Sequence, residues 1–148
     1  MAIQSFNRYG FAYKHAASLS NSFTIHECAR DATNNAQSGK FPVDCNVQSV
    51  EIELSGMSTG GSLPGTVTMY LARDSEGDVG VTPGASTGAT EAIQAGATTA
   101  NTGFVVFEID SDVHHDASVA LSKADSIYAC LKLDQGTATA NVRINWRS

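Results

Sequence analysis

Several stretches of the sequence alternate strictly between apolar and polar residues, and this two-residue period limits the chain to a β-sheet fold. Residues 48–56, for example, place Val50, Ile52 and Leu54 on one side and glutamates on the other. Successive side chains of a strand point to opposite faces, whereas a helix brings every third or fourth residue together. Such runs are typical of antiparallel strands with one face in a core and the other in water.

The same period recurs along the chain and predicts about seven or eight strands. The alternating runs are residues 5–15, 21–29, 48–56, 65–74, 103–110, 126–134 and 138–146, with a shorter run at 92–95. Phe104 and Val106 are apolar as well as the residues between them, so we expect the strand at 103–110 to be more deeply buried than the others. The last two runs flank a short turn that contains Gly136, and this arrangement predicts a β-hairpin.

The composition also favours an all-β fold. Charged residues make up only 16% of the chain, against roughly a quarter in an average globular protein. Small and hydroxylated residues take their place, and these suit half-exposed strands and turns better than helices. A length of 148 residues fits one domain. We therefore predict an antiparallel β-sandwich or jelly roll over residues 21–148, preceded by an N-terminal arm or first strand at residues 1–20.

The charge distribution argues against nucleic-acid and membrane partners. The formal net charge is −6, and the nine lysines and arginines stand singly along the chain. Nucleic acids and anionic membranes are bound by clustered positive charge. Residues 1–18 contain no continuous apolar stretch, so we expect no signal peptide. No apolar run in the sequence approaches the roughly 20 residues of a membrane span, so we expect no span and synthesis in the cytoplasm.

The three cysteines are Cys28, Cys45 and Cys130. Their odd number and the lack of C-x-x-C spacing argue against a disulfide framework and against zinc. We interpret them as thiols that pack as small apolar side chains. A bond between Cys28 and Cys45 stays open if the protein meets oxidising surroundings.

Two acidic stretches are the chemically densest parts of the sequence. Residues 110–116, DSDVHHD, and residues 73–80, RDSEGDVG, each follow a predicted strand. Neither has the full ligand pattern of a calcium loop, and the adjacent histidines of the first point to opposite sides in extended backbone. We interpret both as polar turns. The residues that would hold a structural cation there are Asp74, Asp78, Asp110, Asp112 and Asp116.

No catalytic motif is recognisable. The sequence has no G-x-S-x-G elbow, no phosphate-binding loop and no dinucleotide fingerprint. His26 and Cys28 lie two residues apart on one predicted strand, which β geometry alone explains. We therefore expect a protein that is no enzyme, needs no cofactor and acts through its surfaces.

One class of function left open is a carbohydrate- or receptor-binding sandwich module. Such modules present aromatic rings on a strand face or at loop tips, where the rings stack on sugars. Trp146 lies on the same side of its run as Val142 and Ile144, which predicts that its ring is in the core. Tyr70 and Tyr128 are therefore the outward-facing aromatic candidates.

The other class is a structural subunit that assembles with copies of itself and with a larger shell. Few charges and a long connection rich in glycine, alanine and threonine at residues 80–103 suit packing against neighbours. The aromatic N-terminal stretch is predicted to contact an adjacent subunit. The interface candidates there are Phe6, Arg8, Tyr9, Phe11 and Tyr13.

Three segments carry a resemblance to a known family. They are GTVTMYLARDSEGDVGVTP at residues 65–83, VVFEID at 105–110 and SIYACLKLDQGTATANVRINWR at 126–147. Through them, residues 47–148 resemble the sandwich of small structural proteins of tailed bacteriophages, with the capsid cement (decoration) proteins as the best match. The first third of the chain has no counterpart in this resemblance.

The resemblance implies a fold, a location and a set of partners. It implies a β-sandwich or jelly roll, often a homotrimer, which binds the major capsid protein between capsomers. The protein would then lie on the exterior of an icosahedral virion and stabilise the shell without catalysis. A penton or spike base, a tail tip and a small jelly-roll capsid subunit stay open as other virion positions.

Overall fold

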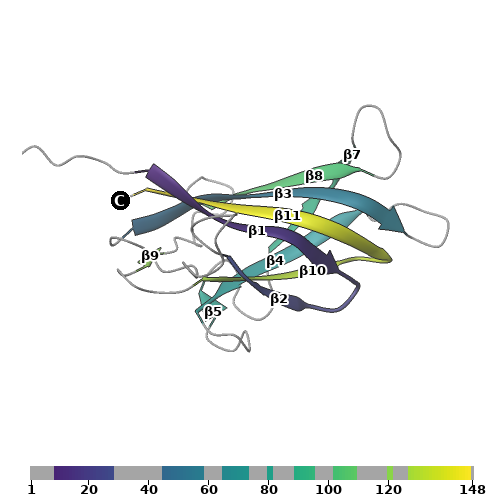
Figure 1. The fold of residues 1–148 in the computed structure, drawn as a ribbon, viewed down its shortest axis with the longest axis horizontal. Helices are drawn as coiled ribbons and strands as arrows, with labels where there is room; N and C mark the ends of the chain where they lie inside the picture. The colour runs from purple at the N-terminus through teal and green to yellow at the C-terminus, as the bar shows by residue number, and fades with distance from the viewer. Residues whose placement is uncertain are drawn as a thin grey trace, which may run out of the picture.

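The computed structural model describes residues 9–28, 45–58, 65–73, 80–81, 89–95, 102–109, 120–121 and 127–147, and its regular elements are strands (Figure 1). The strands are β1 Tyr9–Leu19, β2 Thr24–Glu27, β3 Cys45–Ser58, β4 Thr66–Ala72, β5 Gly80–Val81, β6 Ala89–Ala92, β7 Gln94–Ala95, β8 Gly103–Glu108, β9 Ala120–Leu121, β10 Tyr128–Leu133 and β11 Thr137–Arg147. Within this part of the chain there is no helix of the length and apolar character that a membrane crossing requires.

The strands form two antiparallel sheets that pack face to face. Sheet A has the order β1-β11-β3-β8-β7, and β9 also pairs with β3. Sheet B has the order β2-β10-β4-β5, and β6 also pairs with β4. In Figure 1, β3, β8 and β11 of sheet A lie above β2, β5 and β10 of sheet B. The predicted antiparallel β-sandwich is confirmed.

The connections identify the jelly-roll form of the sandwich. Eight of the described strands have four or more residues: β1, β2, β3, β4, β6, β8, β10 and β11. In that chain order, sheet A holds the first, eighth, third and sixth strands, and sheet B holds the second, seventh, fourth and fifth. The chain therefore changes sheet at every step except from β4 to β6, which is the pattern of an eight-stranded jelly roll.

An apolar layer between the sheets forms the core. On β3, Val50, Ile52 and Leu54 are buried, and the glutamates between them are exposed, as the alternation predicts. Phe107 of sheet A and Met69 of sheet B are fully buried in the same cluster. Among the described residues no polar or charged side chain is buried. The core therefore depends on the apolar inner faces of the two sheets.

The predicted C-terminal β-hairpin is wrong, because β10 and β11 belong to different sheets. β10 pairs with β2 and β4, whereas β11 pairs with β1 and β3. The turn at residues 134–136 carries the chain from sheet B to sheet A, and Gly136 adopts a φ of 73° there. Alternation and a glycine turn show that two strands each bury one face. They do not show whether those faces lie side by side or on opposite sides of a core.

Hydrogen bonds hold this inter-sheet turn against the neighbouring strands. The backbone N–H of Gly65 donates to both carboxylate oxygens of Asp134, at 2.9 and 3.1 Å. The N–H of Leu133 donates to the carbonyl oxygen of Ser20 at 2.8 Å. The turn is thus tied to the beginning of β4 and to the segment between β1 and β2.

The predicted short strand around residues 92–95 is a second place where the chain changes sheet. β6 ends at Ala92 in sheet B, and β7 begins at Gln94 in sheet A. Between them, the N–H of Ile93 donates to the carbonyl oxygen of Gly65 at 2.9 Å, and the side chain of Ile93 packs against the core. Ile93 therefore fixes the point at which the chain passes from sheet B to sheet A.

Residues 9–19 form the first strand, which was one of the two alternatives for the N-terminal 20 residues; residues 1–8 lie outside the described residues. β1 is at the edge of sheet A, and Lys14 lies opposite Val142 on the inward face. The strand is irregular between Lys14 and Ala17, where Ala16 has a φ of 54° and donates its N–H to Asn141 Oδ1 at 3.0 Å. An inward-pointing lysine and a bulge both oppose the addition of another strand at an edge.

The expectation of deeper burial for the strand at 103–110 is wrong on its outer side. Phe107 is fully buried, but Phe104 is 49% exposed. The two side chains point to opposite faces of β8, and Phe104 faces away from sheet B. An apolar residue at an outward position of an alternating run therefore marks exposed surface here.

A matched pair of substitutions tests these facings. We expect Phe107→Ala to lower the free energy of unfolding by about 3–5 kcal/mol, because it leaves a cavity in the core. Phe104→Ala, three positions away on the same strand, should change it by no more than about 0.5 kcal/mol. Urea unfolding followed by intrinsic fluorescence, in dilute solution, measures both. Equal losses for the two variants would contradict the assigned faces of β8.

Candidate functional surface

The aspartates of the two acidic stretches lie outside the described residues, so their role as cation ligands stays a prediction. This applies to all five aspartates proposed above: Asp74, Asp78, Asp110, Asp112 and Asp116. Within the described ranges, no group of three or more histidine, cysteine, aspartate or glutamate side chains converges on a point that a metal ion could occupy.

The neighbouring His26 and Cys28 do not form an activated nucleophile. Cys28 is fully buried, and burial raises the pKa of its thiol to about 12. Its Sγ donates to the backbone carbonyl oxygen of His26 at 3.7 Å, and the His26 ring nitrogen Nε2 lies 2.7 Å from Thr24 Oγ1 instead. A thiol needs a lowered pKa or an adjacent base to react as a nucleophile. Neither condition is met at Cys28.

Cys28 and Cys130 carry free thiols, and both are buried. The side chain of Cys45 lies outside what the structure describes. Cys28 is not bonded to Cys45 in this structure, and a bond between them in oxidising surroundings stays a prediction. Cys28 lies in the core between the sheets, and Cys130 lies on the outward side of sheet B.

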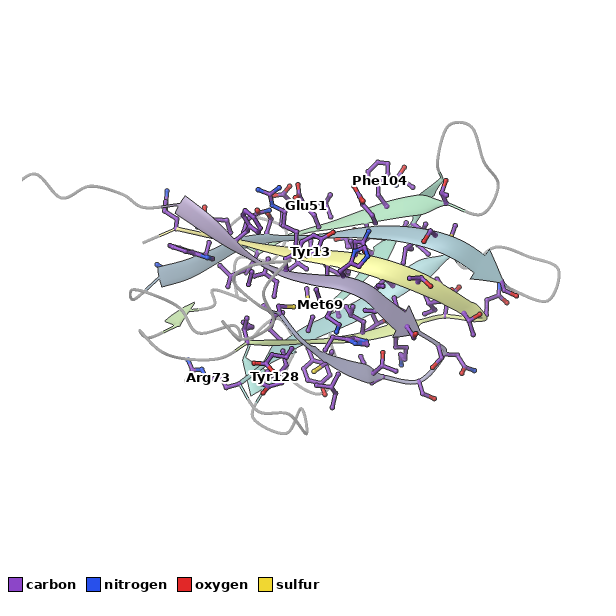
Figure 2. All side chains as sticks on the ribbon, in the orientation of Figure 1. Tyr13, Glu51, Met69, Arg73, Phe104 and Tyr128 are labelled. Atoms are coloured by element: carbon purple, nitrogen blue, oxygen red, sulfur yellow. The ribbon has the colours of Figure 1, made fainter. Side chains whose placement is uncertain are left out.

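We name the outward face of sheet A the outer A face. It carries the aromatic, charged and polar side chains that are the candidates for contact with a partner. Its side chains lie in rows across β1, β11, β3 and β8, because antiparallel partners share a side of the sheet. The rows are Phe11, Asn145, Ser49, Glu108; then Tyr13, Arg143, Glu51, Val106; then Asn141, Glu53, Phe104. Figure 2 shows Glu51 and Phe104 pointing away from the sandwich, while Met69 lies between the sheets.

A connected set of polar contacts orders the centre of the outer A face. Asn145 Nδ2 donates to Ser49 Oγ at 3.0 Å and to Glu51 Oε2 at 3.2 Å. Arg143 Nε donates to Asn145 Oδ1 at 2.9 Å, and it lies 4.0 Å from Glu51 Oε2. The guanidinium of Arg143 also stacks over the ring of Phe11, 4.4 Å from its centroid. These side chains are held in place by neighbours on three different strands.

Two shallow hollows flank these contacts. One of about 460 Å³ lies beside Phe11, Asn145 and Trp146, where Gly10 leaves room for the indole ring because a Cβ there would collide with it. The other, of about 400 Å³, lies beside Phe104 and Glu53. Their size is within the range of ligand sites, but both are open to solvent along one side.

The outward face of sheet B is different, because its aromatic residues pack on one another. Phe23 meets Tyr70 edge to face, with 5.1 Å between ring centroids, and Lys132 Nζ lies 4.8 Å from the Phe23 centroid. Tyr70 is only 7% exposed, and Tyr128 is half-buried. The two tyrosines predicted as outward candidates therefore face outward, as the register requires, but Tyr70 offers no ring surface to a ligand.

The structure places part of the predicted N-terminal interface on the outer A face. Phe11 and Tyr13 lie there, Tyr9 pairs through its backbone with Arg147 in sheet A, and Phe6 and Arg8 lie outside the described residues. Trp146 is in the core, as predicted, at 5% exposure. Phe104 also lies on this face and is not among the predicted interface residues; its only signal in the sequence is an apolar residue at an outward position of an alternating run.

Comparisons with known proteins identify a distant likeness in fold only. No protein-family model and no curated protein sequence matches the chain. A chain of turnip yellow mosaic virus superposes with a TM-score of 0.44 and 10% identity, over 99% of this chain and 82% of that one. A chain of cocksfoot mottle virus gives 0.40 and 10%, over 96% and 93%. The C-terminal CBM6 of LamC, a laminarinase from Zobellia galactanivorans, gives 0.40 and 13%, over 93% and 98%. A likeness at this level assigns no function to this chain.

The buried thiol of Cys28 should be inert in the native protein. A rise from 9.0 to about 12 lowers its thiolate fraction about a thousandfold in mildly alkaline buffer. We expect iodoacetamide to alkylate Cys28 only after unfolding in urea, as read by peptide mass spectrometry. Complete native alkylation within minutes would contradict the burial of this residue.

Stability should fall as the pH drops below the ordinary histidine value. Burial, with a smaller effect from the charge of Lys14, lowers the pKa of His26 below 6.5 in the folded chain. The unfolded chain then binds the proton more tightly, so the stabilisation is present above pH 6.5 and is lost as pH falls through that value towards the folded pKa. We expect His26→Gln to flatten this dependence in thermal unfolding scans. An unchanged pH dependence in His26→Gln would contradict this assignment.

Proposed function

We propose that this chain is a structural subunit of a virus particle and that it performs no catalysis. The observation that carries the proposal is the outer A face of the jelly roll. Within the described residues, the only large apolar side chains classed as exposed are Phe11 and Phe104, and both lie on this one face. The two rings lie at opposite corners of the face, with Arg143, Glu51 and polar side chains between them. A face that combines aromatic side chains, arginine and polar groups has the composition of a protein contact surface.

The jelly-roll topology is compatible with this proposal but does not carry it. Capsid proteins, lectins and cupins share the architecture, so the fold alone leaves the function open. The described residues offer no converging metal ligands, and the thiol of Cys28 is not activated. What they do offer is an ordered, partly apolar surface on a rigid sheet.

Within the virion, we place the chain as a cement (decoration) protein on the outside of the capsid. The support is the sequence resemblance of residues 47–148, which implies a homotrimer bound to the major capsid protein between capsomers. Several weak contacts made by one oligomer act together, so the bound state persists until all of them release. A small jelly-roll subunit of the shell itself is the nearest alternative position.

The mass and shape of the purified full-length protein test this proposal. Size-exclusion chromatography with light scattering, followed by negative-stain electron microscopy, separates the possibilities. A stable trimer supports the cement position, and closed particles support the shell position. A protein that stays monomeric at high micromolar concentration would overturn the assignment as a structural subunit.

A second candidate function, a carbohydrate-binding module, is favoured by the hollow beside Phe11. Asn145, Ser49 and Arg143 supply donors and acceptors at its edge, as sugar hydroxyls require. It ranks second because the Arg143 guanidinium covers one face of the Phe11 ring, on which a sugar would stack. A glycan array tests it: a ligand whose binding falls at least tenfold with Asn145→Ala would establish this reading.

A further inference from the structure

We infer that the outer A face binds the same face of a second copy, with a twofold axis that runs parallel to the strands midway between β11 and β3. The inference names a partner for the proposed assembly and rests on that proposed function for its biological role. It follows from the order of side chains across the rows of the outer A face. An isologous contact requires a surface that is complementary to itself after rotation.

The middle row is complementary to itself under this rotation. The axis places β11 of one copy over β3 of the other, so Arg143 faces Glu51 of the second copy, and Glu51 faces its Arg143. Both side chains are available for this contact, with 50% and 49% of their surfaces exposed. Each arginine would then lie between two glutamates, and each glutamate between two arginines. Opposite charges at matching positions set the register of a contact and exclude wrong ones.

Two further pairs of positions match under the same rotation, whereas in the first row Phe11 faces Glu108 of the second copy. Tyr13 at one end of the middle row faces Val106 of the second copy, which pairs an aromatic ring with an aliphatic side chain. In the next row, Asn141 faces Glu53 of the second copy, which joins an amide donor to a carboxylate. A twofold axis along the rows would instead place Arg143 over itself, and the like charges would repel. The order of side chains in the rows therefore favours the axis parallel to the strands over the axis along the rows.

The face is large enough for a specific contact. β1, β11 and the part of β3 beside them span about eleven residues each, and β8 spans six; at about 3.3 Å per residue and 4.8 Å between strands they cover about 600 Å². Two such footprints total about 1,200 Å², the lower end of the range for specific interfaces. Aligned sheets cross at about 30°, which keeps the central rows of the two faces opposite each other.

Two charge reversals and their mixture test the arrangement. Arg143→Glu puts acidic groups at both positions of the middle row, and Glu51→Arg puts basic groups at both. We expect each variant alone to weaken the pairing of copies through the outer A face at least tenfold in sedimentation velocity. An equimolar mixture of the two should regain the wild-type association, because every cross-contact then joins opposite charges. Lys132→Glu, on the outward side of sheet B, is the control and should associate like the wild type.

The outcomes separate this inference from the proposed function. Wild-type association in either single variant, or a mixture that stays monomeric, would overturn the twofold contact. Circular dichroism and urea unfolding confirm that each variant is folded, because exposed charge reversals should change stability by no more than about 0.5 kcal/mol. Restored association in the mixture, from a protein that forms neither trimers nor particles, would support the contact and overturn the virion role. Trimers or particles that both single variants form as well as the wild type would support the virion role and overturn the twofold contact.

Discussion

The apolar layer between the two sheets is the constraint on which the rest of the structure depends. Every long strand turns alternate residues into this layer, and the described residues bury no polar or charged side chain in it. Burial of apolar surface is worth roughly 25 cal/mol per Å², so a single side chain such as Phe107 contributes a few kcal/mol. Because side chains alternate, committing one set of residues to the core also decides which residues point outward.

Much of the fold was predictable from this alternation, and its failures have a common cause. The strands around residues 48–56 and 65–74 have the faces that the sequence predicts. The alternation does not show which strands pair with each other, and the sequence predicted, wrongly, that β10 and β11 form a hairpin. In the structure they bury their apolar faces on the same core from opposite sides. Pairing depends on the whole set of strands, and a local pattern cannot report it.

The candidate surface was less predictable than the fold. Phe11 and Tyr13 were expected at an interface, and they lie on the outer A face. Arg143 and Glu51 lie beside them, and Phe104 lies at the far corner of the same face; these residues come from strands far apart in the sequence and share a face only through the register of four strands. The acidic stretches drew attention because their charges are adjacent in the sequence. Charges that are adjacent in the sequence need not form a site. Side chains on the outer A face come together because of the order of strands in sheet A.

The position of β11 in sheet A determines when this surface can form. β11 lies between β1 and β3, so the first strand of sheet A has its partner only after residues 137–147 have been synthesised. Until then β1 and β3 lack the strand that joins them, and contacts between residues this distant in sequence form slowly. The outer A face takes residues from β1, β3, β8 and β11, so it forms only when β11 has paired with both of its neighbours. A contact made through this face therefore requires a completed sheet A, and a chain whose β11 is unpaired cannot make it.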